Sequence, residues 1–507
     1  MHYESALTAL YKRGIAESFP LHTAGYLLVA ESLLMLLCTV LFGLKDVHLY
    51  QYVIATALGG LIGTGLIVFF KSPDNVTASS GILTINLLWL VAILYGTAPY
   101  LIDGFHPSEA IFESISGFTT TGMSVVTDVA GLSNPILIWR ATTGWAGGIG
   151  FIIMFCLLLR YFGLDGRNIF VSDGLNTTSS NSTKSIISTS LNFIAVYTLL
   201  TGVLAIILSF LGNDIIDSIC ISMSTISTTG FSTLNSDLVE ISMASKVFIG
   251  GFLMLSAMNF LTLFDAMTEF RLRKIVMDPE IRHMFYWFIG SSIVMLTIVY
   301  QSGAMTWNVE NVVDSILMII SIGTTTGFVF NGFTFPTVAM LFLCILALIG
   351  GCRESPTGGI KVARLSLIFR TMRNTISTVG FPNEVRAVKF GDVYVKNSIC
   401  YSALTTALLF IMTAGLGTLM IGISGVGLLD SFYLCISSLT TTGTGLYSVA
   451  NVASIPVFAQ VIMCILMWLG RMEITLALAM FTTTFWKESR AVLKNGIYAL
   501  WGTIRKT

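Results

Sequence analysis

The stretch SIGTTTGF, residues 321–328, places three threonines and a closing glycine in the middle of a very apolar chain. The stretch is too polar to face lipid and too short to be a soluble loop. Similar stretches occur three more times, as SGFTTTGMS from residue 116, STISTTGFS from residue 224 and SSLTTTGTG from residue 437. One such motif would be weak evidence, because threonine clusters often cap helices or form turns, but a fourfold repeat indicates a common role.

The four stretches share one register over fourteen residues. Successive glycines are separated by 108, 97 and 116 residues, and two threonines precede each glycine. A serine stands six residues before each glycine and an acid thirteen residues before it. The aligned acids are Glu109, Asp217, Asp314 and Asp430, and the serines are Ser116, Ser224, Ser321 and Ser437. The aligned threonines and glycines are Thr120, Thr121 and Gly122; Thr228, Thr229 and Gly230; Thr325, Thr326 and Gly327; and Thr441, Thr442 and Gly443.

This register predicts four short helices that point their C-terminal ends at the threonines and glycines. Acids favour helix N-termini, so each helix should run for about three turns from the acid to the serine. Its negative dipole end would favour a cation, and glycine would let the backbone turn its carbonyls toward a common axis. A ring of oxygens without carboxylates suits a dehydrated monovalent cation better than calcium. A second interpretation of the acids, a negative outer vestibule, stays open.

The composition indicates a polytopic membrane protein. Of the 507 residues, 54% are hydrophobic and only 11% are charged, whereas soluble proteins carry about 25% charged residues. Stretches of roughly 20 apolar residues are long enough to cross a bilayer as helices, and the first lacks the features of a cleaved signal peptide. The predicted spans lie near 24–43, 51–70, 81–100, 136–160, 187–211, 244–270, 285–301, 335–370, 398–422 and 455–485.

Charge distribution predicts the orientation of the chain. The segments 101–135, 213–243, 303–334 and 424–455, which contain the four motifs, hold no Lys or Arg. Most of the 27 basic residues lie in the segments on the opposite side. By the positive-inside rule both termini are cytoplasmic, and the four motif segments enter from outside as re-entrant loops. No nucleotide-binding glycine loop is visible, so any nucleotide sensing would need another chain.

With these motifs the chain resembles the Trk/Ktr/HKT superfamily of cation transporters, most closely its TrkH branch. Three further stretches carry the resemblance: LIWRATTGWAGGIG (137–150), GGCRESPTGGIK (350–361) and LGRMEI (469–474). The resemblance implies an all-α polytopic fold with four pseudo-symmetric helix–pore helix–helix repeats around a central pore, plus two extra N-terminal transmembrane helices. The expected parts are the N-terminal segment with the extra helices (1–78), repeats one to three (79–170, 171–278 and 279–375), and repeat four with the C-terminus (376–507).

The resemblance also implies a function. The expected activity is potassium uptake across the bacterial inner membrane, by a homodimer gated by a cytosolic nucleotide-binding subunit of the TrkA type. In this family glycine at all four filter positions favours potassium, and all four are glycine here. Potassium is then the permeant ion bound by the twelve aligned threonines and glycines. Membrane lipid is the expected surroundings, and neither an organic cofactor nor a nucleic acid is expected.

The resemblance further implies a gate beneath the filter. Its expected residues are Arg471 of the last span and Gly350, Gly351, Arg353, Glu354, Gly358 and Gly359 of the glycine-rich loop. The family loop usually carries Ala, Gly and Thr where this chain has Arg353, Glu354 and Pro356. Two charges and a proline should stiffen the loop, and the charges could pair with each other. Arg471 either repels cations at a constriction or pairs with Glu473 or another acid.

Other residues have less specific interpretations. Lys361 and Arg364 either contact a gating partner or anchor the cytoplasmic side. We expect Glu31 to bond a neighbouring helix and Arg140 to anchor the outer end of its span. The dispersed cysteines and histidines show no metal or disulfide spacing, and no catalytic arrangement supports an enzyme. The alternative to a channel-like pore is an ion-coupled secondary transporter with re-entrant substrate-binding segments, and a membrane scaffold or receptor is a third possibility.

Overall fold

The chain is mainly helical in the computed structural model, with 74% helix, which confirms the all-α class. The structure describes residues 16–42, 48–72, 78–161, 183–271, 273–332, 335–380, 388–391, 393–443 and 452–483. The chain divides into two compact units. The first comprises residues 1–114, 133–139 and 475–507, and the second comprises residues 115–132 and 140–474.

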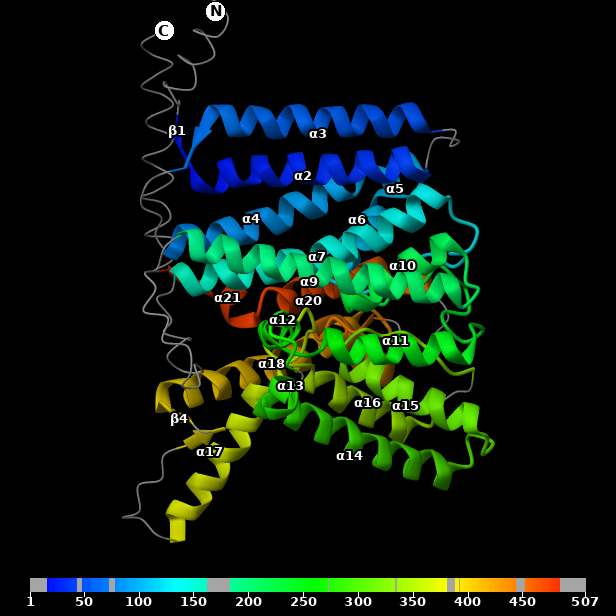
Figure 1. Cartoon of the computed structure of the whole chain (residues 1–507), viewed down its shortest axis with the longest axis vertical. Helices are drawn as coiled ribbons and strands as arrows, with labels where there is room; N and C mark the ends of the chain where they lie inside the picture. Colours follow the sequence, from blue (N-terminus) through cyan, green and yellow to red (C-terminus); the bar gives the residue numbers. More distant parts are fainter. Residues whose placement is uncertain are drawn as a thin grey trace, which may run out of the picture. The chain divides into compact units, whose positions relative to one another are not determined.

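The first unit contains a bundle in which α2 contacts both α3 and α4 (Figure 1). Glycines let α2 and α3 approach closely, since a Cβ on Gly25 would lie 2.7 Å from the carbonyl oxygen of Gly63. A two-residue parallel ladder joins β1 to β2. The elements are β1 (Ala16–Glu17), α2 (Phe19–Phe42), α3 (Leu49–Phe69), β2 (Phe70–Lys71), α4 (Ala78–Gly96) and α5 (Ala98–Ile102).

Glu31 of α2 is buried in this unit without a hydrogen-bond partner. Its side chain is 3% exposed, and neither carboxyl oxygen bonds another group in the described part of the chain. The neighbouring Ser32 hydroxyl instead lies 3.0 Å from the Tyr95 hydroxyl, which donates to the carbonyl of Ala55. The expectation that Glu31 bonds a neighbouring helix is therefore wrong, and the hydroxyls beside it link the three helices.

The second unit holds most of the remaining helices, and α6, α7 and α21 each contribute residues to both units. A short antiparallel ladder pairs β3 with β4 on the segment between α17 and α18. The elements are α6 (Pro107–Phe118), α7 (Asn134–Tyr161), α9 (Thr183–Phe210), α10 (Ile215–Ile226), α11 (Met243–Ser256), α12 (Phe260–Thr268), α13 (Arg273–Met277), α14 (Pro279–Ser302), α15 (Val309–Gly323), α16 (Thr337–Ile349), α17 (Val362–Gly380), β3 (Val388–Phe390), β4 (Val393–Val395), α18 (Asn397–Ile423), α19 (Leu428–Leu439), η2 (Val452–Ser454), α20 (Val457–Arg471) and α21 (Ile474–Ala479).

Three predicted spans are broken helices. The span 244–270 consists of α11 and α12, which are bent by 103°. The Asn259 side chain caps the second piece by accepting hydrogen bonds from the N–H groups of Leu261 and Thr262. The span 335–370 is interrupted by the loop 350–361, and the span 455–485 by residues 472–473. Apolar length alone does not reveal the first and third breaks, because each lies inside a hydrophobic stretch, whereas the loop 350–361 is visible as GGCRESPTGGIK.

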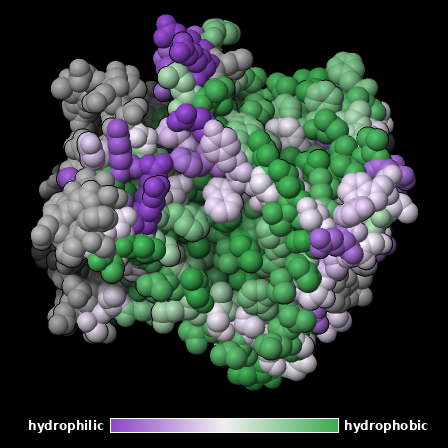
Figure 2. Space-filling view, turned by 90° about the horizontal axis from the view of Figure 1, so that it is seen from below, coloured by the Kyte–Doolittle hydropathy of each residue, from purple (hydrophilic) through white to green (hydrophobic). Residues whose placement is uncertain are grey.

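The unbroken helices have the dimensions of membrane spans. Within the described ranges, six helices are long and apolar enough to cross a bilayer, and the bent pair α11–α12 would make a seventh. Figure 2 shows a broad hydrophobic surface bordered by hydrophilic side chains on two sides. Large apolar residues of α14, including Tyr286, Ile289 and Ile293, are exposed. Such an apolar exterior fits a lipid environment rather than water.

Candidate functional site

Four short helices carry the repeated motif: α6, α10, α15 and α19, of 12, 12, 15 and 12 residues. Each ends beside its threonines, as predicted. At each end the N–H of the threonine before the glycine donates to the carbonyl of the serine in the motif. The four N···O distances are 2.9 Å for Thr121 to Ser116, 2.9 Å for Thr229 to Ser224, 2.8 Å for Thr326 to Ser321 and 2.9 Å for Thr442 to Ser437.

The acids do not all cap these helices. Glu109 accepts a hydrogen bond from the N–H of His106 at the start of α6, at 3.1 Å. In α10 the capping side chain is Asp214 rather than Asp217. Asp314 lies in the second turn of α15, where it pairs with Lys246, because α15 begins five residues earlier than the motif suggests. The predicted place of the acids in the first helical turn is therefore confirmed for Glu109, Asp217 and Asp430 and is wrong for Asp314.

The backbone of the four segments alternates in handedness. The first threonine of each pair has a positive φ, 54° for Thr120, 55° for Thr228, 54° for Thr325 and 52° for Thr441. The glycines also have positive φ, 72° for Gly122, 82° for Gly230, 82° for Gly327 and 78° for Gly443. The intervening threonine keeps a negative φ. Alternating signs of φ turn successive carbonyls to the same side of a strand, which a regular β-strand does not do.

The four segments close into a ring. A Cβ on Gly122 would lie 1.9 Å from the carbonyl oxygen of Thr229, so the first segment abuts the second. The same approach joins Gly230 to Thr326 at 1.9 Å, Gly327 to Thr442 at 1.7 Å and Gly443 to Thr121 at 2.1 Å. Each glycine thus meets the next segment, and the fourth meets the first. Only glycine leaves room for these contacts, which explains its presence in all four motifs.

The threonine hydroxyls of the ring fall into two groups. The hydroxyl of the threonine before each glycine lies 2.7–2.9 Å from a hydroxyl two residues earlier in all four segments. The hydroxyls of Thr120, Thr228 and Thr441 are buried and have no hydrogen-bond partner among the described residues. Buried hydroxyls normally have a partner, so these three oxygens are available to a ligand.

Further glycines bring the following helices onto the ends of the short helices. A Cβ on Gly147 of α7 would lie 2.1 Å from the carbonyl oxygen of Phe118, at the end of α6. A Cβ on Gly470 of α20 would lie 2.0 Å from the carbonyl oxygen of Leu439, at the end of α19. These contacts give a packing reason for Gly147 in the stretch 137–150 and for Gly470 in the stretch 469–474.

The loop 350–361 contacts the ring directly. The N–H of Gly358 donates to the hydroxyl of Thr325 at 2.7 Å. A Cβ on Gly358 would lie 2.1 Å from the carbonyl oxygen of Thr440 and 2.5 Å from the hydroxyl of Thr441. The loop therefore lies against the threonines of the third and fourth segments, and Gly350 and Gly359 turn it with φ of 70° and 75°.

The charged residues of this loop bond neighbouring helices. The N–H of Arg353 donates to Oε1 of Glu280 in α14 at 2.7 Å, and its side-chain Nε lies 3.7 Å from Oε2. The carbonyl of Glu354 accepts from the N–H of Phe260, and the N–H of Cys352 donates to the carbonyl of Ala257. The predicted internal pairing stays a prediction, and the hydrogen bonds of these residues fasten the loop to α14 and to the break between α11 and α12.

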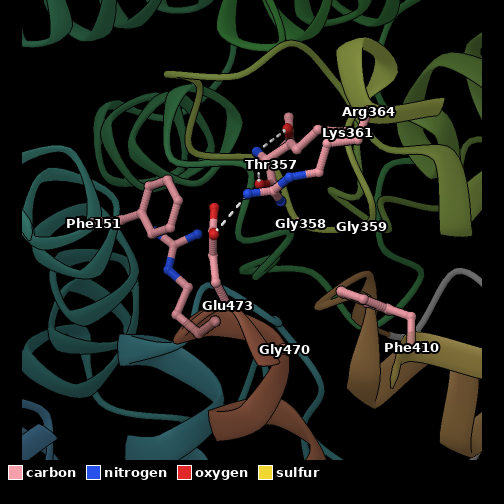
Figure 3. A pocket seen from close by; sticks show the side chains of 10 residues that line it. Phe151, Thr357, Gly358, Gly359, Lys361, Arg364, Phe410, Gly470 and Glu473 are labelled. Carbon is pink, nitrogen blue, oxygen red and sulfur yellow. Dashed lines mark hydrogen bonds and ion pairs between the residues drawn. The ribbon is translucent and has the colours of Figure 1, made fainter. Parts of the chain in front are cut away.

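Arg471 and Lys361 both line a small cavity next to the loop, which Figure 3 shows from close by. Arg471 is 2% exposed, its guanidinium donates to the carbonyls of Pro356 and Gly147, and it lies 4.5 Å from the centroid of the Phe151 ring. The cavity is lined by Phe151, Thr357, Gly358, Gly359, Lys361, Arg364, Phe410, Gly470, Arg471 and Glu473. Three basic residues against one acid make this lining positive.

Glu473 pairs with Arg364, at 2.8 Å, so the proposed pairing of Arg471 with Glu473 is not what the structure shows. Lys361 is 4% exposed, and its Nζ donates to the carbonyl of Ser355, 3.2 Å away, and to the Thr357 hydroxyl, 2.9 Å away. In this conformation Lys361 is too buried to contact a partner protein. Burial contradicts the first of its two sequence interpretations, contact with a partner, whereas anchoring of the cytoplasmic side stays a prediction. The observed role of Lys361 is to brace the loop.

Two further buried basic residues, Lys246 and Arg140, lie inside helices, and no role was predicted for Lys246. Lys246 of α11 is 2% exposed and bonds Asp314 and the carbonyl of Phe330. Arg140 of α7 is also 2% exposed, and its Nη1 donates to the carbonyl of Ser232. That it anchors the outer end of its span stays a prediction. A basic residue inside an apolar stretch is the signal that could have pointed to both positions.

The loop after the second segment carries Asp237, which has a φ of 55°. Its Oδ2 accepts a hydrogen bond from the N–H of Val329 at 2.9 Å. Burial raises the pKa of this carboxyl to about 7, and the bond from Val329 acts in the opposite direction. No group of His, Cys, Asp and Glu that could hold a metal ion occurs in the ranges that the structure describes.

Comparisons with known proteins agree on one family. The sequence matches the family described as TrkH, cation transport protein, over residues 48–327 and 308–487. It is 29% identical to the Trk system potassium uptake protein TrkH of Halomonas elongata, over 85% of this chain and 92% of that protein. It is 30% identical to the protein of the same name from Escherichia coli K12, over 82% of this chain and 88% of that protein. The crystal structure of the potassium transporter TrkH from Vibrio parahaemolyticus superimposes with a TM-score of 0.85 and 25% identity, over 92% of this chain and 98% of that one.

Proposed function

The chain belongs to the TrkH family of cation transport proteins, and from this premise we propose that it takes up potassium through the ring of four T-T-G segments. The family consists of cation transporters, not enzymes, and its members span the membrane several times. The proposed location is the bacterial inner membrane, with both termini in the cytoplasm. The proposed architecture is four helix–pore helix–helix repeats around the pore, with the two extra helices α2 and α3 before them.

One observation carries the proposal: each filter glycine abuts a carbonyl-bearing threonine of the next segment, in a closed cycle of four. The alternating φ values support carbonyls that face the centre of this cycle and replace the hydration shell of an ion. The unpartnered hydroxyls of Thr120, Thr228 and Thr441 add oxygens at one edge. Because these ligands are neutral, they favour a monovalent cation over calcium.

The proposed gate lies beneath this ring. The loop 350–361 bonds Thr325 through Gly358, and Arg471 holds the loop from the other side through the carbonyl of Pro356. The positive lining around Arg471 would oppose an entering cation, so conduction requires the loop and Arg471 to move apart. We assign this movement to a cytosolic nucleotide-binding partner of the TrkA type, acting on a homodimer.

Transport would then be driven by the membrane potential, since a cation gains about 2.3 kcal/mol for each 100 mV. The alternative of an ion-coupled secondary transporter predicts a substrate site between inverted repeats. A closed cycle of four similar segments is better suited to an ion filter than to such a substrate site.

The test is rubidium uptake into proteoliposomes that contain the purified protein, its nucleotide-binding partner and nucleotide, with potassium or sodium as the competitor. Gly122→Ser is the diagnostic variant, because its side chain would collide with the carbonyl of Thr229 in a backbone conformation that serine disfavours. Gly251→Ser is the matched control, since Gly251 is exposed on α11 and an added Cβ there would meet nothing within 4 Å.

We expect potassium to block uptake and sodium to block it weakly in the wild type and in Gly251→Ser. In Gly122→Ser the preference for potassium should fall by about tenfold, which corresponds to about 1.4 kcal/mol. Equal competition by the two ions in the wild type would contradict the potassium assignment. Absence of uptake with the partner and nucleotide present would contradict the pore itself.

A further inference from the structure

A buried lysine bonds the backbone next to the third filter segment. Lys246 lies in α11, the helix that follows the second filter segment, and it is 2% exposed. Its Nζ donates to both carboxylate oxygens of Asp314 in α15, at 3.2 and 3.0 Å, and to the carbonyl of Phe330, at 3.1 Å. An ammonium group has three donor hydrogens, so these three acceptors can use all of them. The site is complete within the protein and leaves no position for a ligand.

The bond to Phe330 completes a set of backbone anchors. The three residues after Gly327, residues 328–330, are each tied to a different element. The Ser321 hydroxyl donates to the carbonyl of Phe328 at 2.8 Å. The N–H of Val329 donates to the Asp237 carboxylate at 2.9 Å, and the carbonyl of Val329 accepts from the N–H of Leu238 at 3.1 Å. Lys246 donates to the carbonyl of the third residue, Phe330. The exit of the third filter segment is thereby held in one position.

Stability alone does not account for a charged anchor at this place. A buried ion pair contributes little to stability compared with apolar side chains of similar volume, because both charges lose their hydration. The surroundings are apolar, since Phe328 and Phe330 are fully buried in a core with Ile249 and Leu253 of α11. An ammonium group does something that an apolar residue in this core could not do: it joins a carboxylate of α15 to the backbone after the filter.

The first repeat holds a related contact. Arg140 of α7, the helix that follows the first filter segment, lies 4.3 Å from the centroid of the Phe231 ring. Its Nη1 donates to the carbonyl of Ser232 at 3.4 Å, two residues after the second filter glycine. In both repeats a buried basic residue of one repeat reaches the backbone just after the filter of the next. Each of these two contacts therefore runs from one repeat to the next, in the same order as the contacts of the filter glycines.

We propose that Lys246, with Asp314, is a positioning residue that sets the ion preference of the filter. The proposal rests on the proposed function, that the ring is a potassium filter. A Cβ on Gly327 would lie only 1.7 Å from the carbonyl oxygen of Thr442, so the third and fourth segments are in close contact. A small shift of the third segment would therefore change the placement of carbonyls in the ring. Discrimination between potassium and sodium depends on the number and placement of such carbonyls. Loss of the anchor at Phe330 should therefore weaken the discrimination before it abolishes transport.

The experiment separates positioning from stability with two variants. Lys246→Met removes the ammonium group and leaves the Asp314 carboxylate buried without its cation. The double variant Lys246→Met with Asp314→Asn also removes that carboxylate charge, but it does not restore the bond to Phe330. Lys274→Met is the matched control, because Lys274 pairs with Glu269 at the exposed surface, at 2.6 Å. For each protein we would measure the potassium-to-sodium competition ratio for rubidium uptake and the thermal unfolding midpoint.

We expect the competition ratio to fall by roughly tenfold in Lys246→Met, the scale of one hydrogen bond from a charged donor. The double variant should regain most of the unfolding midpoint and keep the reduced ratio, and Lys274→Met should match the wild type in both. A double variant that regains the wild-type ratio would overturn the proposal, since the pair would then be only structural. An unchanged ratio in folded Lys246→Met would overturn it too. A wild type without potassium preference would instead contradict the proposed function, and the inference would fall with it.

Discussion

The hydrogen bond from Arg471 to the carbonyl of Pro356 is the contact on which closure of the proposed pore would depend. Its guanidinium is buried between the carbonyls of Pro356 and Gly147, and Glu473, the nearest acid in sequence, pairs with Arg364. The charge of Arg471 is therefore not neutralised by Glu473. A positive charge held in this way can act as an electrostatic barrier in addition to a steric one.

Replacing Arg471 with alanine should raise cation flux. Two unit charges about 8 Å apart repel by about 2 kcal/mol at an effective dielectric constant near 20, which corresponds to about thirtyfold in rate. The measurement is rubidium uptake into proteoliposomes without the nucleotide-binding partner, where the wild type should be slow. Arg471→Lys is the control that keeps the charge, and it should stay slow. Unchanged flux in Arg471→Ala would rule out the barrier.

At this scale the sequence predicted which residues form the ring but not how their backbone is arranged. The four T-T-G motifs and the serines before them were visible as a repeat, and the structure brings them together. The positive φ of Thr120 and its three counterparts could not be predicted, because threonine disfavours that conformation and nothing local requires it. Closure of the ring imposes it through contacts between segments more than 90 residues apart in sequence.

Among the elements, the loop 350–361 is held by residues in which this sequence departs from the family loop. Its residues Arg353 and Glu354 are fastened to α14 and to the N-terminus of α12, so the loop is held at its base as well as at the filter. Glu280, at the start of α14, accepts from the N–H of Arg353 at 2.7 Å and is 3% exposed. Loop movement during gating would have to break this bond.

Removing the Glu280 carboxylate should therefore favour the open loop. A hydrogen bond to a charged acceptor contributes about 1.5–3 kcal/mol, so basal rubidium uptake in Glu280→Ala should rise by roughly tenfold. Glu280→Gln retains an acceptor oxygen for the N–H of Arg353 and should give a smaller increase. Size-exclusion profiles would show that both variants are folded. A folded Glu280→Ala protein with wild-type basal uptake would show that this bond does not restrain the loop.

The breaks in the helices mark the limit of predictions at the element scale. Hydropathy located the spans well but joined α11 to α12, α16 to α17 and α20 to α21. The signal at the first break was the capping residue Asn259, which is hard to distinguish from a polar residue inside a span. The start of α15 was misplaced for a related reason, because Asp314 resembles a capping acid but serves as the partner of Lys246. Whether such a polar residue caps a helix or pairs with a distant side chain depends on tertiary contacts, which the local sequence does not show.

For the whole molecule, the ring joins helices from the entire second unit, so ion binding should stabilise the folded protein as a whole. Any ligand that binds only the folded state adds RT ln(1 + [L]/Kd) to its stability, about 2.7 kcal/mol at a hundredfold excess over Kd. The segments that follow α6, α10, α15 and α19 form the proposed site, and none of them would bind an ion alone in the unfolded chain. The unfolding midpoint in detergent should therefore rise with potassium or rubidium.

The expected result is an ion-specific shift. Raising potassium at constant ionic strength, with sodium as the replaced ion, should raise the midpoint, because screening stays the same and only site occupancy changes. Gly122→Ser should lose most of this shift, since its side chain would displace the carbonyl of Thr229, whereas Gly251→Ser should keep it. A shift of equal size when sodium is raised in place of choline would contradict a site that prefers potassium. This measurement needs neither a gating partner nor an open pore, so it tests the filter separately from the gate.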